Sequence, residues 1–240
     1  HQVKANSTTY MKRRVPVFSQ QISAEPGGHF VATIKELLLG NPIGYQLFQR
    51  ANGAEKMRKI FTREYIRTQP GYSILDVACG TADIRPYLGF DVTYTGIDLS
   101  KSYISQNQKK YSRDHTTQFI CINLNDYIAS VKHTRTFDVI LLMGILHHLN
   151  DKDAQDMLAA LPTLLRPGGR AITLDGVFTP NLTTFERFLL RSDRGKFVRA
   201  LDAWQALFSS CLPDATYTIR KDLYYLPYNL IIFQYQRPLS

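Results

Sequence analysis

Two adjacent histidines and an aspartate stand where the chain can carry out proton chemistry. His147 and His148 follow the mostly apolar run Phe137–Met143, and Asp175 ends the mostly apolar run Ala171–Leu174. An imidazole titrates near neutral pH, so it can act as a general base, and a neighbouring carboxylate can orient it. We expect His147 to be the base and Asp175 to orient it or to bind the substrate.

Other interpretations of these three residues stay open. Adjacent histidines cannot both point at one site, so at least one of them can be structural, and His148 is the rival candidate for the base. Asp175 can instead accept hydrogen bonds from backbone amides of the loop that follows it.

A loop of small residues forms a second candidate site. The apolar run Ile74–Val77 leads into Ala78–Ala82, where small side chains let a ligand approach the backbone closely. The loop lacks the glycine spacing of dinucleotide-binding and Walker loops, which disfavours a pyrophosphate site. Asp98 ends the next apolar run about 20 residues later, and one carboxylate there can accept from both hydroxyls of a ribose.

The elements that position these residues follow from the apolar spacing. Short apolar runs alternate with helical patterns, which predicts an α/β fold with a parallel sheet covered on both faces. We expect strands over 73–78, 91–98, 118–122, 137–143 and 170–174, and helices over 83–88, 101–113 and 150–165, the last two capped by Ser100 and Asn150. A C-terminal antiparallel hairpin is expected over 216–225 and 229–236. Residues 1–70 are predicted to form an arm and cap helices, and 71–240 the main domain, with a helical insertion over about 178–211.

Four short segments resemble class I S-adenosylmethionine-dependent methyltransferases. They are Leu75–Ala82, Gly96–Ser100, Leu146–Leu149 and Leu165–Gly169. The resemblance is strongest to the broad group that includes ubiquinone/menaquinone-biosynthesis and sugar methyltransferases. It implies a Rossmann-like, seven-stranded, mostly parallel sheet with a C-terminal antiparallel hairpin, and S-adenosylmethionine as the methyl donor.

The resemblance also implies which residues hold the cofactor. The methionine end would lie against the first loop, the ribose hydroxyls against the acid that ends the second strand, and the adenine against the residues that follow. The amino group would lie over the backbone after the fourth strand. The implied residues are Asp76, Ala78, Gly80, Thr81, Asp98, Leu99, Asn123, Leu124, Met143 and Gly144.

Two departures from the family pattern stand in this loop and beside the adenine. Ala78 and Ala82 replace loop glycines, and both are small enough to keep the loop. Asn123 stands where the family usually has an aspartate beside the adenine; its amide can still form a hydrogen bond there, and Asp126 is the fallback ligand.

The predicted insertion is the expected acceptor side. Arg187, Arg191 and Arg194 are spaced by four and three residues, so they share one helical face that could hold a phosphate or diphosphate. The alternative is an ordinary solvated face. Tyr45 could help to close the pocket, although aromatic residues at helical spacing more often belong to a core.

Composition limits the partners. The chain has 240 residues, with 29 Lys and Arg against 20 Asp and Glu, for a net charge of +9. This charge favours an acidic partner: a phosphorylated small molecule, a lipid headgroup or a nucleic acid. No apolar run approaches the roughly 18 residues of a membrane span, although peripheral membrane contact stays open. Three widely spaced cysteines and no signal-like segment in His1–Arg14 favour a cytoplasmic protein without disulfide or metal site.

These observations favour methyl transfer to a small molecule, most simply to a hydroxyl of an anionic or lipid-like metabolite. A nucleic-acid methyltransferase is the first alternative, disfavoured because the Asn/Asp-Pro-Pro-Tyr and Pro-Cys elements are absent. A non-catalytic cofactor-binding module is the second alternative. The oligomeric state is left open.

Overall fold

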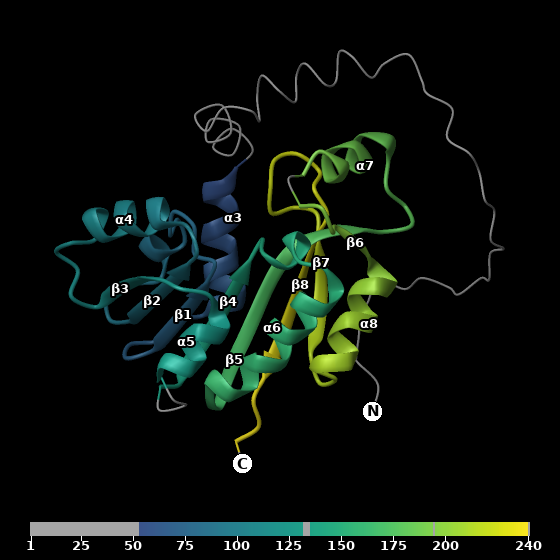
Figure 1. Ribbon diagram of the computed structural model, residues 1–240. Coiled ribbons are helices and arrows are strands. Elements are labelled where there is room, and N and C mark those ends of the chain that lie inside the picture. Colours follow the sequence, from purple (N-terminus) through teal and green to yellow (C-terminus); the bar gives the residue numbers. More distant parts are fainter. Residues whose placement is uncertain (1–52, 132–134, 194, 240) are drawn as a thin grey trace.

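One mixed sheet organises the computed structural model, which describes residues 53–131, 135–193 and 195–239 (Figure 1). The strands are β1 (Ser73–Val77), β2 (Thr93–Asp98), β3 (Thr117–Cys121), β4 (Phe137–Met143), β5 (Leu165–Phe178), β6 (Arg199–Ala200), β7 (Thr216–Arg220) and β8 (Leu230–Gln236). They are ordered β3-β2-β1-β4-β5-β8-β7, with β6 paired to β5 off this path.

Strand direction brings the candidate residues to one edge. Strands β3, β2, β1, β4 and β5 are parallel to their neighbours, whereas β8 is antiparallel to both β5 and β7. The carboxyl ends of the five parallel strands therefore meet at the same edge of the sheet, where open α/β sheets bind their ligands. The expected mostly parallel sheet with a C-terminal antiparallel hairpin is confirmed, and β6 is a short addition to it.

Helices cover both faces of the sheet. The helical elements are α3 (Ala54–Phe61), η1 (Thr62–Ile66), η2 (Arg85–Tyr87), α4 (Lys101–Lys110), α5 (Leu124–Val131), η3 (Leu146–His148), α6 (Asp151–Leu164), α7 (Thr184–Arg191) and α8 (Leu201–Cys211). Helices α5, α6 and α8 share a core cluster on one face, and α3 and α4 contribute to the cluster on the other (Figure 1). None of the helices described is long and apolar enough to cross a membrane.

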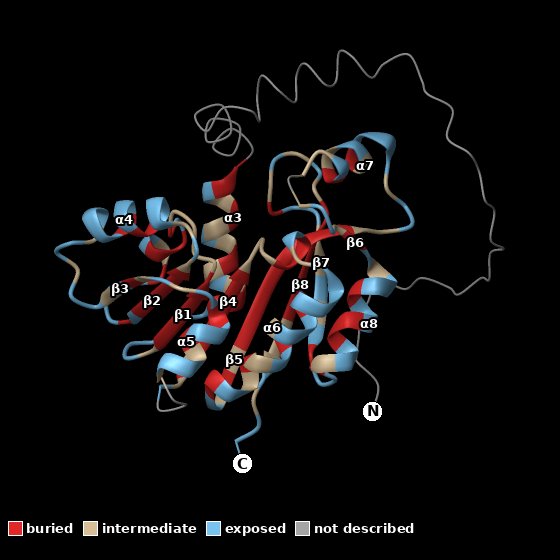
Figure 2. Ribbon diagram, viewed as in Figure 1, coloured by how far each residue is buried: buried red, intermediate tan, exposed pale blue. Residues whose placement is uncertain are grey.

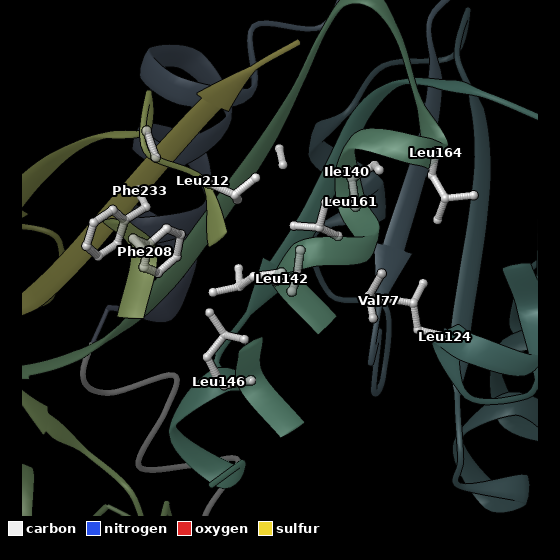
Figure 3. Packing of buried hydrophobic residues seen from close by; sticks show 14 of the residues in the cluster. Val77, Leu124, Ile140, Leu142, Leu146, Leu161, Leu164, Phe208, Leu212 and Phe233 are labelled. Carbon is white, nitrogen blue, oxygen red and sulfur yellow. The ribbon is translucent and has the colours of Figure 1, made fainter. Parts of the chain in front are cut away.

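Side-chain alternation along β4 builds both cores at once. Val139 and Leu141 face the α3 side, and Ile140 and Leu142 face the α6 side; all four are fully buried. Figure 2 shows the central strands buried along their length, and Figure 3 shows the packing on the α6 side. Burying one such side chain contributes roughly 1.5–3 kcal/mol, so β4 is a main source of the sheet's stability.

Helix α8 is held to the sheet by one hydrogen bond and one ring stack. The buried Trp204 donates its indole N–H to the carbonyl oxygen of Gly176 at 3.0 Å. Phe208 stacks on Phe233 of β8 with ring centroids 3.6 Å apart (Figure 3). These contacts bring the end of the predicted insertion back onto β5 and β8.

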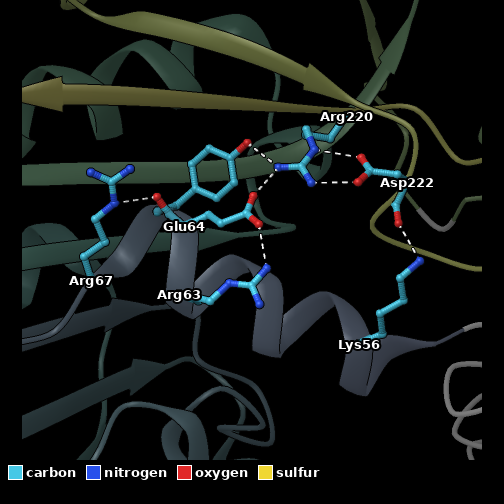
Figure 4. A network of polar contacts seen from close by, with 7 residues as sticks. Lys56, Arg63, Glu64, Arg67, Arg220 and Asp222 are labelled. Carbon is cyan, nitrogen blue, oxygen red and sulfur yellow. Dashed lines mark hydrogen bonds and ion pairs between the residues drawn. The ribbon is translucent and has the colours of Figure 1, made fainter.

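A polar network fastens α3 and η1 to the end of β7 (Figure 4). Arg220 donates to Glu64 at 2.7 Å, to the Tyr65 hydroxyl at 2.9 Å and to both carboxylate oxygens of Asp222 at 2.7 Å. Lys56 of α3 donates to the carbonyl oxygen of Asp222 at 2.7 Å. The described part of the predicted cap region therefore packs directly on the sheet, and a division at residue 70 stays a prediction.

The helix expected over 83–88 is wrong: only the short turn η2 forms there. Pro86 cannot donate a backbone hydrogen bond, which favours a short turn over a helix. The buried Arg85 side chain then donates to the carbonyl oxygen of Gly89 at 2.8 Å, to Asp114 at 2.8 Å and to Thr117 at 2.7 Å. This arginine joins the turn to the start of β3.

Other boundaries differ in length. Strand β5 extends beyond the expected 170–174, and residues 221–229 form a long connection in place of the short turn expected near Pro227. The insertion contains α7, β6 and α8, so its helical pattern is confirmed in outline. Helix α5 was not expected, although Asn123 caps it by accepting the Asp126 backbone N–H at 2.9 Å.

Candidate active site at the carboxyl edge of the sheet

The loop after β1 adopts the tight conformation that the sequence predicts. Ala78, Gly80 and Ala82 all have positive φ, at 58°, 52° and 51°. Glycine adopts this region freely, whereas each alanine there costs roughly 1 kcal/mol. A methyl group added at Gly80 would meet no atom within 4 Å, so there is open space above the loop. Thr81 is partly exposed beside it.

Asp98 joins this loop to the next helix. One of its carboxylate oxygens accepts the Gly80 backbone N–H at 2.8 Å, and the other accepts the Ser100 backbone N–H at 2.8 Å. Ser100 caps α4 as predicted, accepting the Tyr103 N–H at 3.3 Å. Each carboxylate oxygen has a second lone pair, so the partly exposed Asp98 can still accept from a diol.

Leu99 has the exposure that an adenine site needs. Its large apolar side chain is 72% exposed immediately after Asp98. A planar aromatic ring placed on it would remove apolar surface from water. The open space above Gly80, the free acceptor capacity of Asp98 and the exposed Leu99 together fit an adenosyl group.

Asp76 lies below the loop. It is 3% exposed and accepts the Tyr94 hydroxyl proton at 2.5 Å. Burial raises the pKa of Asp76 to about 7, with Asp98 also raising it and the Tyr94 hydrogen bond opposing the shift. In this structure its carboxylate supports the strand and is turned toward Tyr94.

Cys79 is a packed thiol. Burial, followed by the charges of Asp76 and Asp98, holds the pKa of Cys79 well above its usual range, so the thiol is not a nucleophile at neutral pH. A side chain at Gly96 would lie 2.9 Å from the Cys79 sulfur, which shows how closely the loop packs on β2.

Asn123 and Leu124 stand after β3 in different roles. The exposed Asn123 caps α5 and donates to the Asp126 carboxylate at 2.7 Å. Leu124 is 4% exposed and belongs to the core beside Val77 (Figure 3). Their backbone lies at the same edge of the sheet as Asp98, but the Leu124 side chain is buried in the core.

The backbone after β4 is held in place by β5. The Gly144 N–H donates to the Leu174 carbonyl oxygen at 2.7 Å, and both Met143 and Gly144 are partly exposed. The nearest atom to a methyl group built on Gly144 would be the Cε1 atom of His147, at 3.6 Å. The candidate cofactor loop and the histidine pair are therefore neighbours along this edge.

The structure brings His147 and Asp175 together. His147 Nδ1 lies 2.7 Å from Asp175 Oδ1, and the His147 backbone N–H donates to the same oxygen at 3.1 Å. The other ring nitrogen, Nε2, lies 3.3 Å from Asp193 Oδ1. Burial alone would lower the pKa of His147, but hydrogen bonds and charge from Asp175 and Asp193 raise it to about 9.

His148 differs from its neighbour in every respect. Its side chain is exposed, and its ring centroid lies 4.4 Å from that of His147. Burial of part of the ring, followed by the charge of His147, lowers the pKa of His148. At neutral pH the pair therefore consists of a cationic His147 and a neutral His148.

The acceptor-side arginines are only partly described. Arg187 is half-buried and Arg191 is exposed on α7, and neither side chain has an ion-pair partner within the described ranges. Arg194 and Tyr45 lie outside the described residues. The described chain contains no group of three or more His, Cys, Asp or Glu residues able to hold a metal ion.

Several residues at this edge were missed by sequence reasoning. The buried Asn107 of α4 donates to the Gly80 carbonyl oxygen at 2.7 Å and so holds the loop from behind. Asp193 reaches His147 from the insertion, and Tyr228, in the connection before β8, donates to Asp193. No local pattern marks them, because each depends on contacts between segments far apart in the chain.

Comparison with known proteins agrees with this geometry. Residues 75–171 match a family model described as a methyltransferase domain. The ubiquinone/menaquinone biosynthesis C-methyltransferase UbiE of Shewanella halifaxensis is 27% identical over 51% of this chain and 50% of its own length. The 27-O-demethylrifamycin SV methyltransferase of Amycolatopsis mediterranei is 29% identical over 57% of this chain and 52% of its own. The chain thus spans about half the length of these curated relatives.

A solved structure shares the fold. The plantazolicin methyltransferase BpumL, crystallised with a triazolic desmethylPZN analogue and SAH, aligns with a TM-score of 0.59 and 16% identity over 87% of this chain and 96% of its own. The domain match and the strand order identify a class I methyltransferase fold. The methyltransferase-domain match over residues 75–171 and the strand order support a class I S-adenosylmethionine-dependent methyltransferase, as the sequence motifs indicated.

Proposed function

We propose that this protein transfers a methyl group from S-adenosylmethionine to a small-molecule acceptor. The observation that carries the proposal is the partly exposed Gly80 loop, held by Asp98 beside the exposed Leu99. When bound, the sulfonium supplies an already activated methyl group, so the protein mainly has to align the acceptor and exclude water.

Different residues at the carboxyl edge would bind different parts of the cofactor. Asp98 would accept from the ribose hydroxyls and Leu99 would pack on the adenine. The backbone of Gly80 and Gly144 would lie against the methionine end, where neither residue has a side chain in the way.

We further propose that the acceptor presents a hydroxyl group and that a histidine takes its proton. His148 is the better placed of the two rings, because it is exposed and neutral at pH 7. His147 carries its proton at that pH and has both ring nitrogens engaged, so its proposed contribution is charge and orientation, with Asp175 holding it.

The outward face of α7 supports an anionic or lipid-like acceptor. Phe185 is 49% exposed and Phe188 37% exposed, whereas Glu186 of the same helix is buried in its capping box. Arg187 and Arg191 flank the phenylalanines. A helix that points apolar and cationic side chains outward suits an amphiphilic, negatively charged ligand.

The acceptor class can be tested on α7 itself. Exchanging Phe185 and Phe188 for serine, or Arg191 for alanine, should reduce labelling of lipid-soluble acceptors, and raised salt should reduce it in the parent protein. Phe90 is 94% exposed away from α7, so Phe90→Ser is the matched control. Equal labelling in all variants would show that α7 does not meet the acceptor.

We also propose that the protein acts in the cytoplasm. Cys79, Cys121 and Cys211 are all free, which suits a reducing cytoplasm.

Two measurements test the proposed reaction. Calorimetry with S-adenosylhomocysteine should show binding in the micromolar range, and methyl-labelled S-adenosylmethionine incubated with a cell extract should label a small molecule. No binding would overturn the cofactor assignment. Binding without any labelled product would leave a non-catalytic module, and label in RNA would favour the nucleic-acid alternative.

A further inference from the structure

A continuous chain of polar contacts crosses the acceptor side of the site. It runs from Asp175 of β5 through His147 of η3 to Asp193, which follows α7, and on to Tyr228 before β8. Tyr228 donates its hydroxyl proton to the second carboxylate oxygen of Asp193. Asp175 and Asp193 therefore meet at one imidazole, and Tyr228 joins them through Asp193.

The contacts determine the protonation state of that imidazole. Both ring nitrogens of His147 face a carboxylate oxygen, at 2.7 Å for Asp175 and 3.3 Å for Asp193. A neutral ring has only one N–H, so one nitrogen lone pair would then face a carboxylate. With both carboxylates ionised, only the doubly protonated ring satisfies both sides. The same contacts hold the pKa of Asp193 far below its usual range, although burial opposes that shift.

Backbone atoms of residues that follow Asp193 pack closely against His147. The Phe197 N–H donates to the His147 carbonyl oxygen at 2.9 Å, and the Gly195 N–H donates to Asp193 at 2.9 Å. A methyl group at Gly195 would lie 1.8 Å from the Cδ2 atom of His147, so only glycine fits there. The imidazole is thus covered by the segment that follows α7.

Arg199 fixes the other end of the segment that follows Asp193. Its guanidinium donates to the Leu146 carbonyl oxygen at 2.9 Å and to the Leu149 carbonyl oxygen at 2.7 Å, and it pairs with Asp151 at 2.8 Å. These bonds engage carbonyls of η3 and of the residue that follows it. Asp193, Gly195, Phe197 and Arg199 therefore hold the insertion against the turn that carries His147.

We propose that Asp193 and Tyr228 are positioning residues that keep His147 as a cation, and that this cation docks Asp193 and residues 195–199 as one wall of the acceptor site. His148 is then the imidazole whose nitrogens stay free for the acceptor. The wall's role in acceptor binding rests on the proposed function; the charge state of His147 does not.

Among the described residues, the titratable groups next to His147 are Asp175 from β5, Asp193 from the segment after α7, with Tyr228 behind it, and the adjacent His148. Arg199 of β6 adds a positive charge at the neighbouring Leu146 carbonyl oxygen. Removing the Asp193 charge alone should therefore change the titration of His147 more than any surface substitution.

Nuclear magnetic resonance titration of histidine ring carbons in the full chain tests this. The His147 and His148 signals are assigned by their loss in His147→Gln and His148→Gln. We expect His147 to titrate near pH 9 in the parent protein. In Asp193→Asn its midpoint should fall by at least one pH unit, and in Tyr228→Phe by less. Asp193→Glu should restore part of the shift.

Controls separate this effect from damage to the fold. Asp214→Asn removes an exposed charge, and Tyr235→Phe removes a hydroxyl away from the site; both should leave the His147 midpoint unchanged. Hydrogen exchange of residues 195–199 should quicken in Asp193→Asn while exchange in β1 and β4 stays slow. A His147 midpoint near 6.5 in the parent, or one unmoved by Asp193→Asn, would overturn the proposal. Binding of S-adenosylhomocysteine, measured on the same samples, reports the proposed function independently.

Discussion

Asp98, the last residue of β2, accepts the backbone N–H of Gly80 in the loop after the neighbouring strand β1, at 2.8 Å. The same carboxylate accepts the Ser100 N–H at the start of α4. One side chain thus sets the shape of the small-residue loop and offers its remaining lone pairs to a ligand. The loop and the acid are therefore one unit and not two separate motifs.

Removing this carboxylate should weaken cofactor binding. Charge-assisted hydrogen bonds contribute roughly 1.5–3 kcal/mol, so we expect Asp98→Ala to lower the affinity for S-adenosylhomocysteine by about 10–100-fold in calorimetry. Asp91→Ala removes an exposed acid ahead of the same strand and serves as control. Equal affinities in the two variants would show that Asp98 does not meet the ligand.

The positive φ of Ala78 predicts that glycine at this position is tolerated, whereas valine lowers the free energy of unfolding. Ala78→Gly relieves about 1 kcal/mol of strain but adds similar entropy to the unfolded chain, so the free energy of unfolding should change by less than about 1 kcal/mol. Ala78→Val places a β-branched residue at φ 58° and should cost roughly 1–3 kcal/mol. Denaturant unfolding measures both, and a valine variant as stable as the parent would contradict the loop conformation.

The network of Figure 4 predicts which arginine stabilises the fold. Arg220 is 19% exposed and joins Glu64, Tyr65 and Asp222, so Arg220→Ala should lower the free energy of unfolding by about 1–3 kcal/mol. Arg63 is 74% exposed and pairs only with its neighbour Glu64, so Arg63→Ala should change it by less than about 0.5 kcal/mol. Thermal unfolding of the two variants compares them; similar losses would refute the network's role.

The histidine pair predicts how stability depends on pH. The pKa of His147 is raised in the folded state from 6.5 to about 9, so its contribution is complete below pH 6.5 and is lost as pH rises through 9. We expect the parent to lose on the order of 1–3 kcal/mol of unfolding free energy between pH 7 and pH 10 relative to His147→Gln. Parallel curves for the two proteins would rule out the cation.

Local signals predicted the elements that position the cofactor side. Ser100 and Asn150 are caps in the structure, and the run 137–143 is a strand with the predicted bounds, because capping and burial are properties of neighbouring residues. Of the helix expected over 83–88, only the single turn η2 forms, because Pro86 cannot donate a backbone hydrogen bond and the buried Arg85 binds distant partners.

The acceptor side was less predictable for the same physical reason. The spacing of His147 and Asp175 after adjacent strands predicted their contact. Nothing in the sequence near Asp193 shows that it would reach His147, since that contact depends on how the insertion folds back over η3. The engagement of both ring nitrogens, and hence the different charges of the two histidines, could be known only from the structure.

The contacts of Arg199 and Trp204 show which attachment points a chimera with an exchanged insertion should keep. Besides the apolar packing of α8, the insertion meets the ends of β4 and β5 through polar contacts that include Asp193 on His147, Arg199 on the Leu146 carbonyl oxygen and Trp204 on the Gly176 carbonyl oxygen. A chimera that exchanges this stretch for another while preserving these three attachment points would graft a new acceptor specificity onto an unaltered donor half. A graft lacking them would leave a buried charge and two carbonyl oxygens without their partners.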